Sequence, residues 1–428
     1  MLQRLGKLEH NIKIVVVGIG SVGKGIVYQT QITPGIDCIG IANRNIQKAI
    51  ACAEWMGRQF QIVQTRGELY AAIEAGRLAV TDNGNLLAQC ELADALIESS
   101  SAIYEGAQHA ITALRHGLHT IMVNAEADLT YGPLLLSIAE SEGVVYSSCD
   151  GDQPAAIKRL IDRILFWGFD LVMAGNIKGY LDRYANPTSI IPEADRRGLG
   201  HKVCTSFTDG TKLGIEMAIV ANALGLRTAV PGMIGPRGAQ ISQVFQLFDL
   251  DALWGGDRQP LVDYILGAQP KGGVFVIAHS DRKYQQFTLN WIPSELGPGP
   301  YYVFYRPFHL RHIEALNTVV DAVLDSKSLL KPDCGFKTNV IAYARQDLKK
   351  GDRLDGIGGY CCYGLIENTH DGNGSPPGLP ICLSDNVILG RDVIKDARIT
   401  LQDVVYDSNA PRFTLYAEAL TAGRKPMD

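Results

Sequence analysis

The stretch IKIVVVGIGSVGKGIVYQT, residues 12–30, decides the fold of the first part of the chain. Five of its first six residues are β-branched and apolar, as in a parallel strand that is buried on both faces. The segment from Ser21 to Thr30 has the character of a helix. Between them stands Gly18-Ile19-Gly20-Ser21-Val22-Gly23, the pattern G-x-G-x-x-G. In a strand–turn–helix context this pattern indicates a dinucleotide-binding turn.

Each glycine of this turn has its own expected task. Gly18 permits the tight turn, Gly20 lets the backbone approach a pyrophosphate, and Gly23 lets the helix pack on the strand. The free amides at the helix N-terminus would hold the pyrophosphate, and the helix dipole favours its charge. The alternative is a glycine-rich turn without a ligand.

The strand expected at residues 37–42 carries the signal for the type of cofactor. It ends in Ala42-Asn43-Arg44-Asn45, without the Asp or Glu that usually accepts the ribose hydroxyls of NAD. The guanidinium of Arg44 suits a 2′-phosphate. The alternative is that Arg44 is an ordinary solvated charge at the end of a strand. We therefore predict NADP, with NAD as the alternative. The predicted cofactor-binding residues so far are Gly18, Ile19, Gly20, Ser21, Val22, Gly23, Asn43 and Arg44.

Outward from the turn, the first 150 residues alternate short strands with helices. Further strands are expected at residues 93–99, 120–124 and 144–148, with helices at 46–60 and 103–116. This alternation predicts a parallel sheet wound by right-handed crossovers. The fold class is thus α/β, with an N-terminal Rossmann dinucleotide-binding domain over residues 1–150. A helix at 307–325 is expected to pack back on it.

The pattern changes after Asp150. Helices at 154–167 and 212–224, a polar loop at 176–200, and strands at 170–175, 275–279, 287–291 and 301–305 predict an α+β domain over residues 151–306. This domain would carry catalysis and oligomerisation. Short strands at 339–344, 360–365 and 404–405, with turns such as residues 371–374, predict a small, separable all-β domain over residues 335–410.

Composition limits the classes of function. The chain has 428 residues, 46% hydrophobic and 20% charged, with a net charge of −5 and no run of like charge. Nucleic acid and membrane surfaces therefore lack electrostatic support as partners. No apolar stretch approaches the roughly 18 residues of a membrane span. Nine cysteines without a C-x-x-C pair argue against a disulfide framework or a zinc site. We expect a cytoplasmic protein with a small-molecule substrate.

Several motifs beyond the glycine turn point to a known family. They are VNAEAD at 123–128, GDQP at 151–154, TDGTK at 208–212, GPYYVFYRPFHL at 299–310 and DGIGGY at 355–360. Together they resemble the homoserine dehydrogenase-like NAD(P)-dependent oxidoreductases with a C-terminal SAF domain, a β-clip. The resemblance implies an enzyme that transfers hydride to or from a small polar carbonyl or hydroxy compound, and a homodimer or homotetramer.

Two alternatives to this activity stay open. The same family contains enzymes similar to deoxyxylulose phosphate reductoisomerase, in which a metal-assisted rearrangement precedes reduction by NADPH. The chain also departs from the homoserine dehydrogenases, which have a lysine where this sequence has Glu126. A carboxylate there would repel a substrate carboxylate, so homoserine itself is in doubt. A cofactor-binding regulatory protein without turnover is therefore the second alternative.

Candidate catalytic residues follow from the need to neutralise an alkoxide after hydride transfer. The resemblance matches the family's second lysine with Asp209 and Lys212, and it places Ser99 and Ser100 beside the nicotinamide. If Asp209 and Lys212 lie three positions apart on one helix, the Asp209 carboxylate could orient the Lys212 ammonium. Lys212 is the first choice of proton donor and Lys178 the second. The alternatives are a surface ion pair for Lys212 and an exposed loop cation for Lys178.

The remaining candidates are polar residues near these positions. In the loop 176–200, Asp182 and Arg183 are predicted to bind substrate. Arg183 would hold a carboxylate or phosphate group of the substrate. Glu126 is a further candidate catalytic residue, as the proton carrier if neither lysine acts. Glu126 and Asp128 could also bind a divalent cation or accept substrate hydroxyls, and an acidic helix start is an equal alternative. His309 and His312 lack a third metal ligand, so packing is the better interpretation. The need for a metal is left open.

Overall fold

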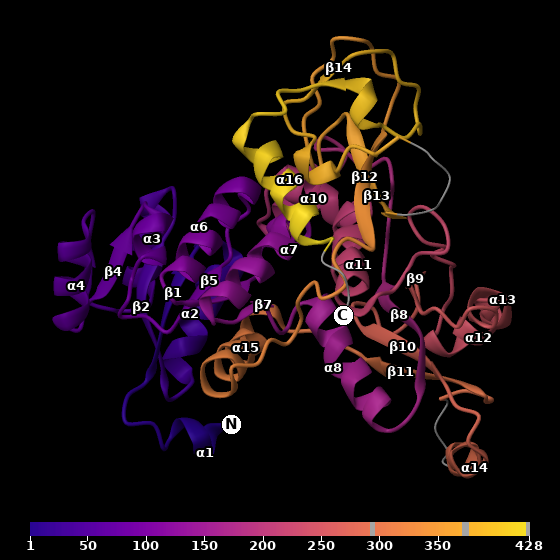
Figure 1. The fold of residues 1–428 in the computed structure, drawn as a ribbon, viewed down its shortest axis with the longest axis horizontal. Helices are drawn as coiled ribbons and strands as arrows, with labels where there is room; N and C mark the ends of the chain where they lie inside the picture. Colours follow the sequence, from indigo (N-terminus) through magenta and orange to yellow (C-terminus); the bar gives the residue numbers. More distant parts are fainter. Residues whose placement is uncertain (292–295, 370–375, 425–428) are drawn as a thin grey trace. The chain divides into compact units, whose positions relative to one another are not determined.

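The computed structural model describes residues 1–291, 296–369 and 376–424 (Figure 1). The chain forms two compact units. The first contains Met1–Ala155, Leu310–Lys331 and Glu418–Gly423, and the second contains Ala156–His309 and Pro332–Ala417 with Arg424. Each unit is therefore assembled from separate stretches of the sequence.

A seven-stranded sheet in the order β3-β4-β2-β1-β5-β6-β7 forms the centre of the first unit. All its neighbouring strands are parallel, which confirms the predicted Rossmann-type α/β fold. The strands are β1 (Ile12–Val17), β2 (Ile36–Ala42), β3 (Phe60–Ile62), β4 (Leu78–Thr81), β5 (Ala95–Glu98), β6 (His119–Met122) and β7 (Tyr146–Ser148). The chain reverses its direction across the sheet between β1 and β5, so the glycine turn after β1 lies at the switch point where such sheets bind ligands.

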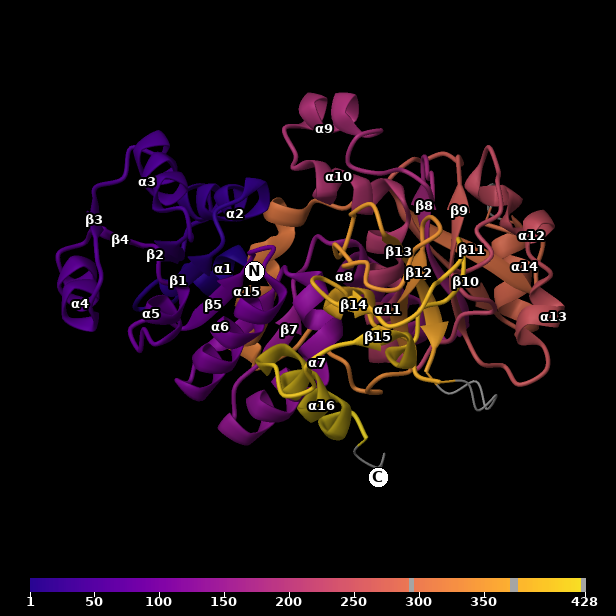
Figure 2. The same cartoon turned by 90° about the horizontal axis from the view of Figure 1, so that it is seen from above.

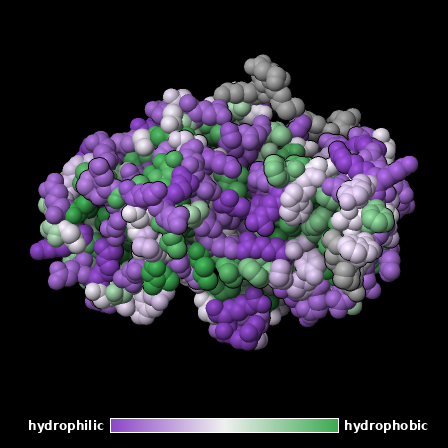
Figure 3. Space-filling model, turned by 90° about the horizontal axis from the view of Figure 1, so that it is seen from below, coloured by the Kyte–Doolittle hydropathy of each residue, from purple (hydrophilic) through white to green (hydrophobic). Residues whose placement is uncertain are grey.

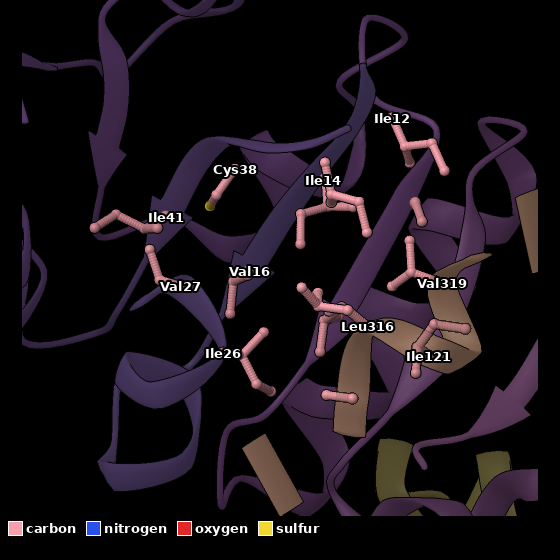
Figure 4. Close-up of a cluster of buried hydrophobic side chains, with 14 of the residues drawn as sticks. Ile12, Ile14, Val16, Ile26, Val27, Cys38, Ile41, Ile121, Leu316 and Val319 are labelled. Atoms are coloured by element: carbon pink, nitrogen blue, oxygen red, sulfur yellow. The ribbon is translucent and has the colours of Figure 1, made fainter. Parts of the chain in front are cut away.

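Helices cover this sheet. They are α1 (Leu2–Leu5), α2 (Ser21–Ile32), α3 (Ile46–Trp55), α4 (Arg66–Glu74), α5 (Gly84–Ala88), α6 (Ile103–Arg115), α7 (Ala125–Glu142) and α15 (Arg311–Asp325). The late helix α15 packs beside α2 and β6 within this unit. Its Leu316 and Val319 point toward Ile14 and Ile121 of the sheet (Figure 4). Each such fully buried aliphatic side chain stabilises the fold by about 1.5–3 kcal/mol.

The second unit is built on a mixed sheet in the order β11-β10-β8-β9. Strands β8 (Asp170–Lys178) and β9 (Leu261–Leu266) are parallel, whereas β10 (Val274–His279) is antiparallel to β8 and to β11 (Tyr301–Arg306). Two small antiparallel pairs follow: β12 (Thr338–Ala344) with β13 (Cys362–Asn368), and β14 (Ile388–Leu389) with β15 (Val404–Val405). The helices of this unit are α9 (Ile191–Arg197), α10 (His201–Thr208), α11 (Thr211–Leu224), α12 (Val244–Leu247), α13 (Leu250–Trp254) and α14 (Lys283–Trp291), together with most residues of α8 (Gln153–Phe166) and α16 (Pro411–Ala422).

The C-terminal strands, for which a separable domain over residues 335–410 was expected, belong to the same compact unit as Ala156–His309. Strands β12 and β13 lie beside α11, as Figures 1 and 2 both show. The Asn222 side chain of α11 accepts a hydrogen bond of 2.8 Å from the amide of Thr338 in β12. This packing places residues 332–417 in the same compact unit as residues 156–309.

Three further expectations need correction or lie outside the structure. The strand expected at residues 287–291 is the end of α14; Phe287 and Trp291 are exposed, so their alternation with polar residues does not bury one face of a sheet. The polar loop at 176–200 contains the end of β8 and helix α9. The turn expected at residues 371–374 lies outside the described residues.

Hydropathy of the surface is mixed. The face shown in Figure 3 has hydrophobic residues (green) in separate areas between hydrophilic ones (purple). Across the described part of the chain, no helix is both long enough and apolar enough to cross a membrane.

Candidate functional site

The glycine turn of the first unit has the geometry that its sequence predicts. Gly18 has φ 96°, and a Cβ there would overlap the backbone of Ser99 and Ser100. A Cβ on Gly23 would overlap the carbonyl oxygen of Gly18 and lie 2.7 Å from Ser99 Oγ. Both positions therefore exclude a side chain for reasons of packing within the unit.

Gly20 differs from these two glycines. A Cβ on Gly20 would have no atom of the described chain within 4 Å, and Gly20 is the N-cap of α2 without a side-chain cap. Ser21, Val22 and Gly23 form the first turn of α2, so their amides lie at the positive end of the helix. The open space beside Gly20 and the uncapped amides fit a pyrophosphate.

Asn43 and Arg44 follow β2 and have different settings. The Asn43 side chain accepts a hydrogen bond of 3.0 Å from the amide of Ile19 and donates one of 2.9 Å to the carbonyl of Asn45. It therefore holds the glycine turn in place. Arg44 is exposed, and its guanidinium makes no hydrogen bond or ion pair with the described residues.

The end of β5 is braced by buried polar groups. Ser99 Oγ donates to the carbonyl oxygen of Gly18 at 2.6 Å. Glu98, fully buried, accepts from the amide of Ser100 at 2.8 Å and lies 2.9 Å from His109 Nδ1. Glu98 was not among the predicted residues, although a carboxylate at the end of the apolar run from Ala95 to Ile97 is a signal that could have found it.

The two acidic candidates at the start of α7 separate. Glu126 is half-buried in the first turn of the helix. Asp128 is buried, and its carboxylate accepts from the hydroxyls of Tyr146 and Ser148 in β7. Burial and the nearby Asp128 raise the pKa of Tyr146 well above its usual value. Both oxygens of Asp128 thus accept hydrogen bonds from β7, and its role in binding substrate stays a prediction.

The expected arrangement of Asp209 and Lys212 on one helix is wrong. Helix α10 ends at Thr208 with Asp209 as its C-cap, Gly210 has φ 90°, and α11 begins at Thr211. The left-handed conformation of Gly210 breaks the helix between the two residues. One oxygen of the Asp209 carboxylate accepts from the amide of Thr211 at 2.8 Å.

The other oxygen of Asp209 is held by a residue that the sequence did not reveal. Arg345, which follows β12, donates from Nη2 to Asp209 Oδ2 at 2.6 Å, and both side chains are buried. The same guanidinium donates to the carbonyls of Arg183, Ala185 and Cys362. Burial raises the pKa of Asp209, and the charge of Arg345 opposes this shift. Arg345 and Asp209 are 136 positions apart, so no local pattern connects them.

Lys212 and Lys178 lie on two elements of the second unit. Lys212 stands in the first turn of α11 and is 7% exposed. Lys178 is the last residue of β8 and is half-buried. It therefore ends a strand rather than lying in the expected loop.

Asn176 of β8 is a further polar residue that sequence reasoning missed. It is fully buried, and neither atom of its side-chain amide has a hydrogen-bond partner among the described residues. Two positions apart on one strand, Asn176 and Lys178 face the same side of the sheet. The sequence did not indicate a buried amide at Asn176, because the strand was expected to end at Gly175 and Asn176 was assigned to the loop after it.

A cavity of about 250 Å³ lies within the second unit. Arg183 and Asp209 line this cavity. Lys212 and Lys178 are not among the described residues that line it. Asp182 accepts from the amide of Tyr184 at 3.0 Å and donates its own amide to the carbonyl of Thr208 at 2.8 Å. It thereby shapes the loop that carries Arg183.

No group of three or more His, Cys, Asp or Glu within the described residues is arranged to hold a metal ion. His309 Nδ1 lies 2.9 Å from the carbonyl oxygen of Gly272 in the second unit. His312 packs against Gly25 of α2 in the first unit, where an added Cβ would lie 2.5 Å from the imidazole ring. Both histidines thus have packing contacts.

Residues 151–315 match the family model "Oxidoreductase DRL, catalytic domain". The match includes β8, α11 and the candidate lysines. The catalytic part of this chain is therefore that of an oxidoreductase. The sequence matches no curated protein.

Solved structures with similar folds share little sequence with the chain. DOX-P reductoisomerase with fosmidomycin and magnesium is 16% identical, with a TM-score of 0.37 over 48% of this chain and 56% of that chain. A proposed homoserine dehydrogenase from Archaeoglobus fulgidus is 20% identical, with a TM-score of 0.33 over 49% of this chain and 68% of that chain. Myo-inositol dehydrogenase from Lactobacillus casei is 16% identical, with a TM-score of 0.30 over 44% and 53%. The chain thus spans about half the length of two of these structures, and TM-scores of this size carry no inference about substrate or mechanism.

Proposed function

We propose that the protein is an NADP-dependent oxidoreductase that transfers hydride to or from a small polar carbonyl or hydroxy compound. The observation that carries the proposal is the turn after β1, where the space beside Gly20 and the uncapped start of α2 fit a pyrophosphate. The match of residues 151–315 to an oxidoreductase catalytic domain supports it independently.

The preference for NADP rests on Arg44. Its guanidinium is exposed at the end of β2 and has no partner within the described chain, so its donors are available to a 2′-phosphate. Asn43 fixes the turn beside it through Ile19. When bound, the nicotinamide supplies or accepts the hydride.

Lys212 is proposed to handle the proton. In the reducing direction the carbonyl carbon gains a hydride and its oxygen gains a negative charge, which a proton from the Lys212 ammonium neutralises to give the alcohol. In the oxidising direction the neutral amine takes that proton back. The lysine lies buried in the first turn of α11, within the part of the chain that matches the oxidoreductase catalytic domain. Lys178 and Asn176, on one face of β8, are proposed to hydrogen-bond the oxygens of the substrate.

The test replaces Lys212 with Met, which keeps the apolar stem and removes the charge. Turnover with NADPH and a panel of glyceraldehyde, dihydroxyacetone and their phosphates should fall by about 10²–10⁴-fold. The dissociation constant of NADPH should stay within a factor of two. Lys178→Met is the matched control, and a parent rate in Lys212→Met with a dead Lys178→Met would exchange the two roles.

A rearrangement before reduction stays the alternative reaction. It predicts that turnover with NADPH needs a divalent cation, so dialysis against a chelator followed by addition of Mg²⁺ distinguishes it from simple hydride transfer. A homodimer or homotetramer and a SAF-like fold for the tail also stay predictions. The second unit does expose large aromatic side chains at the end of α8 and on α14, of the kind that gather at protein interfaces: Phe166, Tyr284, Phe287 and Trp291.

A further inference from the structure

The cavity of the second unit is enclosed by segments that are far apart in the sequence. Its walls are the loop at residues 181–184, the turn from α10 into α11, the residues Gly232 and Met233, strand β9 and strand β13. The Asp263 carboxylate fixes the segment after Met233 by accepting from the amides of Ile234 at 3.0 Å and Gly235 at 2.8 Å. The walls are thus held in place by bonds within the unit.

Two polar groups in the lining make no hydrogen bond with the described residues. The guanidinium of Arg183 makes no hydrogen bond or ion pair with the described residues, and it lies over the face of the Tyr363 ring at 5.6 Å. The hydroxyl of Tyr264 likewise makes no hydrogen bond within the described chain. An arginine fork and a phenol beside one another are donors for a carboxylate or phosphate.

The charges around the cavity favour an anion. Asp209 is the acidic residue of the lining, and its charge is matched by Arg345. Asp396 lies near Arg183, but it accepts from the hydroxyls of Tyr184 and Tyr363, and Lys395 lies over the Tyr184 ring at 3.9 Å. The start of α11 adds the positive end of a helix dipole. Arg183 is therefore the basic side chain of the lining that is available to an anion, since the acidic one, Asp209, is already matched.

Lys212 does not share this cavity. Leu213 and Gly214 line it, and at 3.6 residues per turn Lys212 points about 160° away from Gly214 around the axis of α11. A ligand in the cavity would therefore bind on the opposite side of the helix from the proposed proton donor.

We infer that this cavity is a binding site for a small organic anion, a carboxylate or phosphate ester, separate from the carbonyl substrate at Lys212. The volume of about 250 Å³ has room for about eight groups of the size of water, which fits a molecule of a few carbons with one anionic group. The Arg183 guanidinium forms two parallel hydrogen bonds to the anionic group, and the Tyr264 hydroxyl donates a third. The glycines 214, 232 and 364 provide a smooth wall against the remainder of the ligand.

The test is calorimetric titration of the full chain, without cofactor, using inorganic phosphate, malate and glycerol 3-phosphate as probes. We expect saturable binding of at least one probe at millimolar concentration or below. Arg183→Gln should weaken it by about 10- to 100-fold, and Tyr264→Phe by about 2- to 10-fold. Arg258→Gln is the matched control, because Arg258 is another exposed arginine over an aromatic ring, that of Trp254, and it does not line the cavity.

Two more variants show whether the probe binds at this cavity rather than at the catalytic site, and whether a loss of binding reflects misfolding. Lys212→Met should bind the probe like the parent chain. Gly214→Ala adds a methyl group that would lie 3.6 Å from the amide nitrogen of Ile366, an ordinary van der Waals distance. The variant should therefore keep the thermal unfolding midpoint while its affinity for the probe falls. The inference is overturned if none of the three probes binds, if Arg183→Gln and Gly214→Ala bind like the parent, or if Lys212→Met loses binding. Because no cofactor is present, these outcomes do not depend on the proposed hydride transfer.

Discussion

Replacing Gly20 with Ala separates cofactor binding from folding. Gly20 has φ −85° and ψ −164°, an extended conformation that alanine adopts freely, and the added Cβ would meet no atom of the described chain within 4 Å. The change should therefore leave the free energy of unfolding equal or raise it by about 0.4–1 kcal/mol, because alanine has less freedom than glycine in the unfolded chain.

The same methyl group would stand where a pyrophosphate approaches the backbone. Displacing one hydrogen bond between an amide and a charged phosphate costs about 1.5–3 kcal/mol, which corresponds to a dissociation constant of NADPH about 10- to 100-fold higher. Gly23→Ala should behave in the opposite way, since its Cβ would overlap the Gly18 carbonyl and so destabilise the first unit.

Fluorescence titration with NADPH and urea unfolding followed by circular dichroism give the two quantities. Gly67→Ala is the matched control, because Gly67 in α4 also has open space around its Cβ and lies outside the turn. A dissociation constant for Gly20→Ala within a factor of two of the parent and of Gly67→Ala would refute the assignment of this turn to the pyrophosphate.

Three further changes test other parts of the account. Arg44→Asp should raise the dissociation constant of NADPH by about 10- to 100-fold and lower that of NADH, since a carboxylate accepts the ribose hydroxyls; equal constants for both cofactors in the parent chain would contradict this. Arg345→Met should lower the free energy of unfolding by about 3–5 kcal/mol because it leaves Asp209 buried without its cation, and Asp209→Asn in the same chain should recover part of the loss; urea unfolding measures both. Asn176→Leu should keep or raise stability by about 1–3 kcal/mol while turnover falls, because a buried amide without partners is replaced by an apolar group of similar size; a less stable chain would show that the amide has a structural partner.

The part of the fold that the sequence predicts well is local. A strand, a turn and a helix in 19 consecutive residues carry their own geometry, and the three glycines 18, 20 and 23 differ in the structure as their order in the motif implies. The break between Asp209 and Lys212 was also a local signal, because Asp-Gly is a typical turn dipeptide, but the spacing of three suggested a continuous helix.

What the sequence could not show depends on contacts across long separations. Nothing near Asp209 indicates that Arg345 holds its carboxylate, and nothing in β12 and β13 indicates that α11 covers them. The alternation at residues 287–291 resembles a strand, but a strand also needs a neighbour, and the helix forms there instead. The short strands after residue 335 have the pattern of an independent domain. Helix α11, which packs on β12 and β13, lies more than 100 residues earlier, so the local sequence does not show this contact.

The interleaving of the two units along the sequence has a consequence for synthesis. The ribosome releases the core of the first unit up to Ala155 early, but α15, whose Leu316 and Val319 complete that core, emerges only after the whole stretch from Ala156 to His309. The second unit also depends on a late stretch, because Arg345 and β13 come after α15. Each unit is therefore completed only after residues of the other have been synthesised between its own stretches, so we expect much of the folding of both units to follow translation.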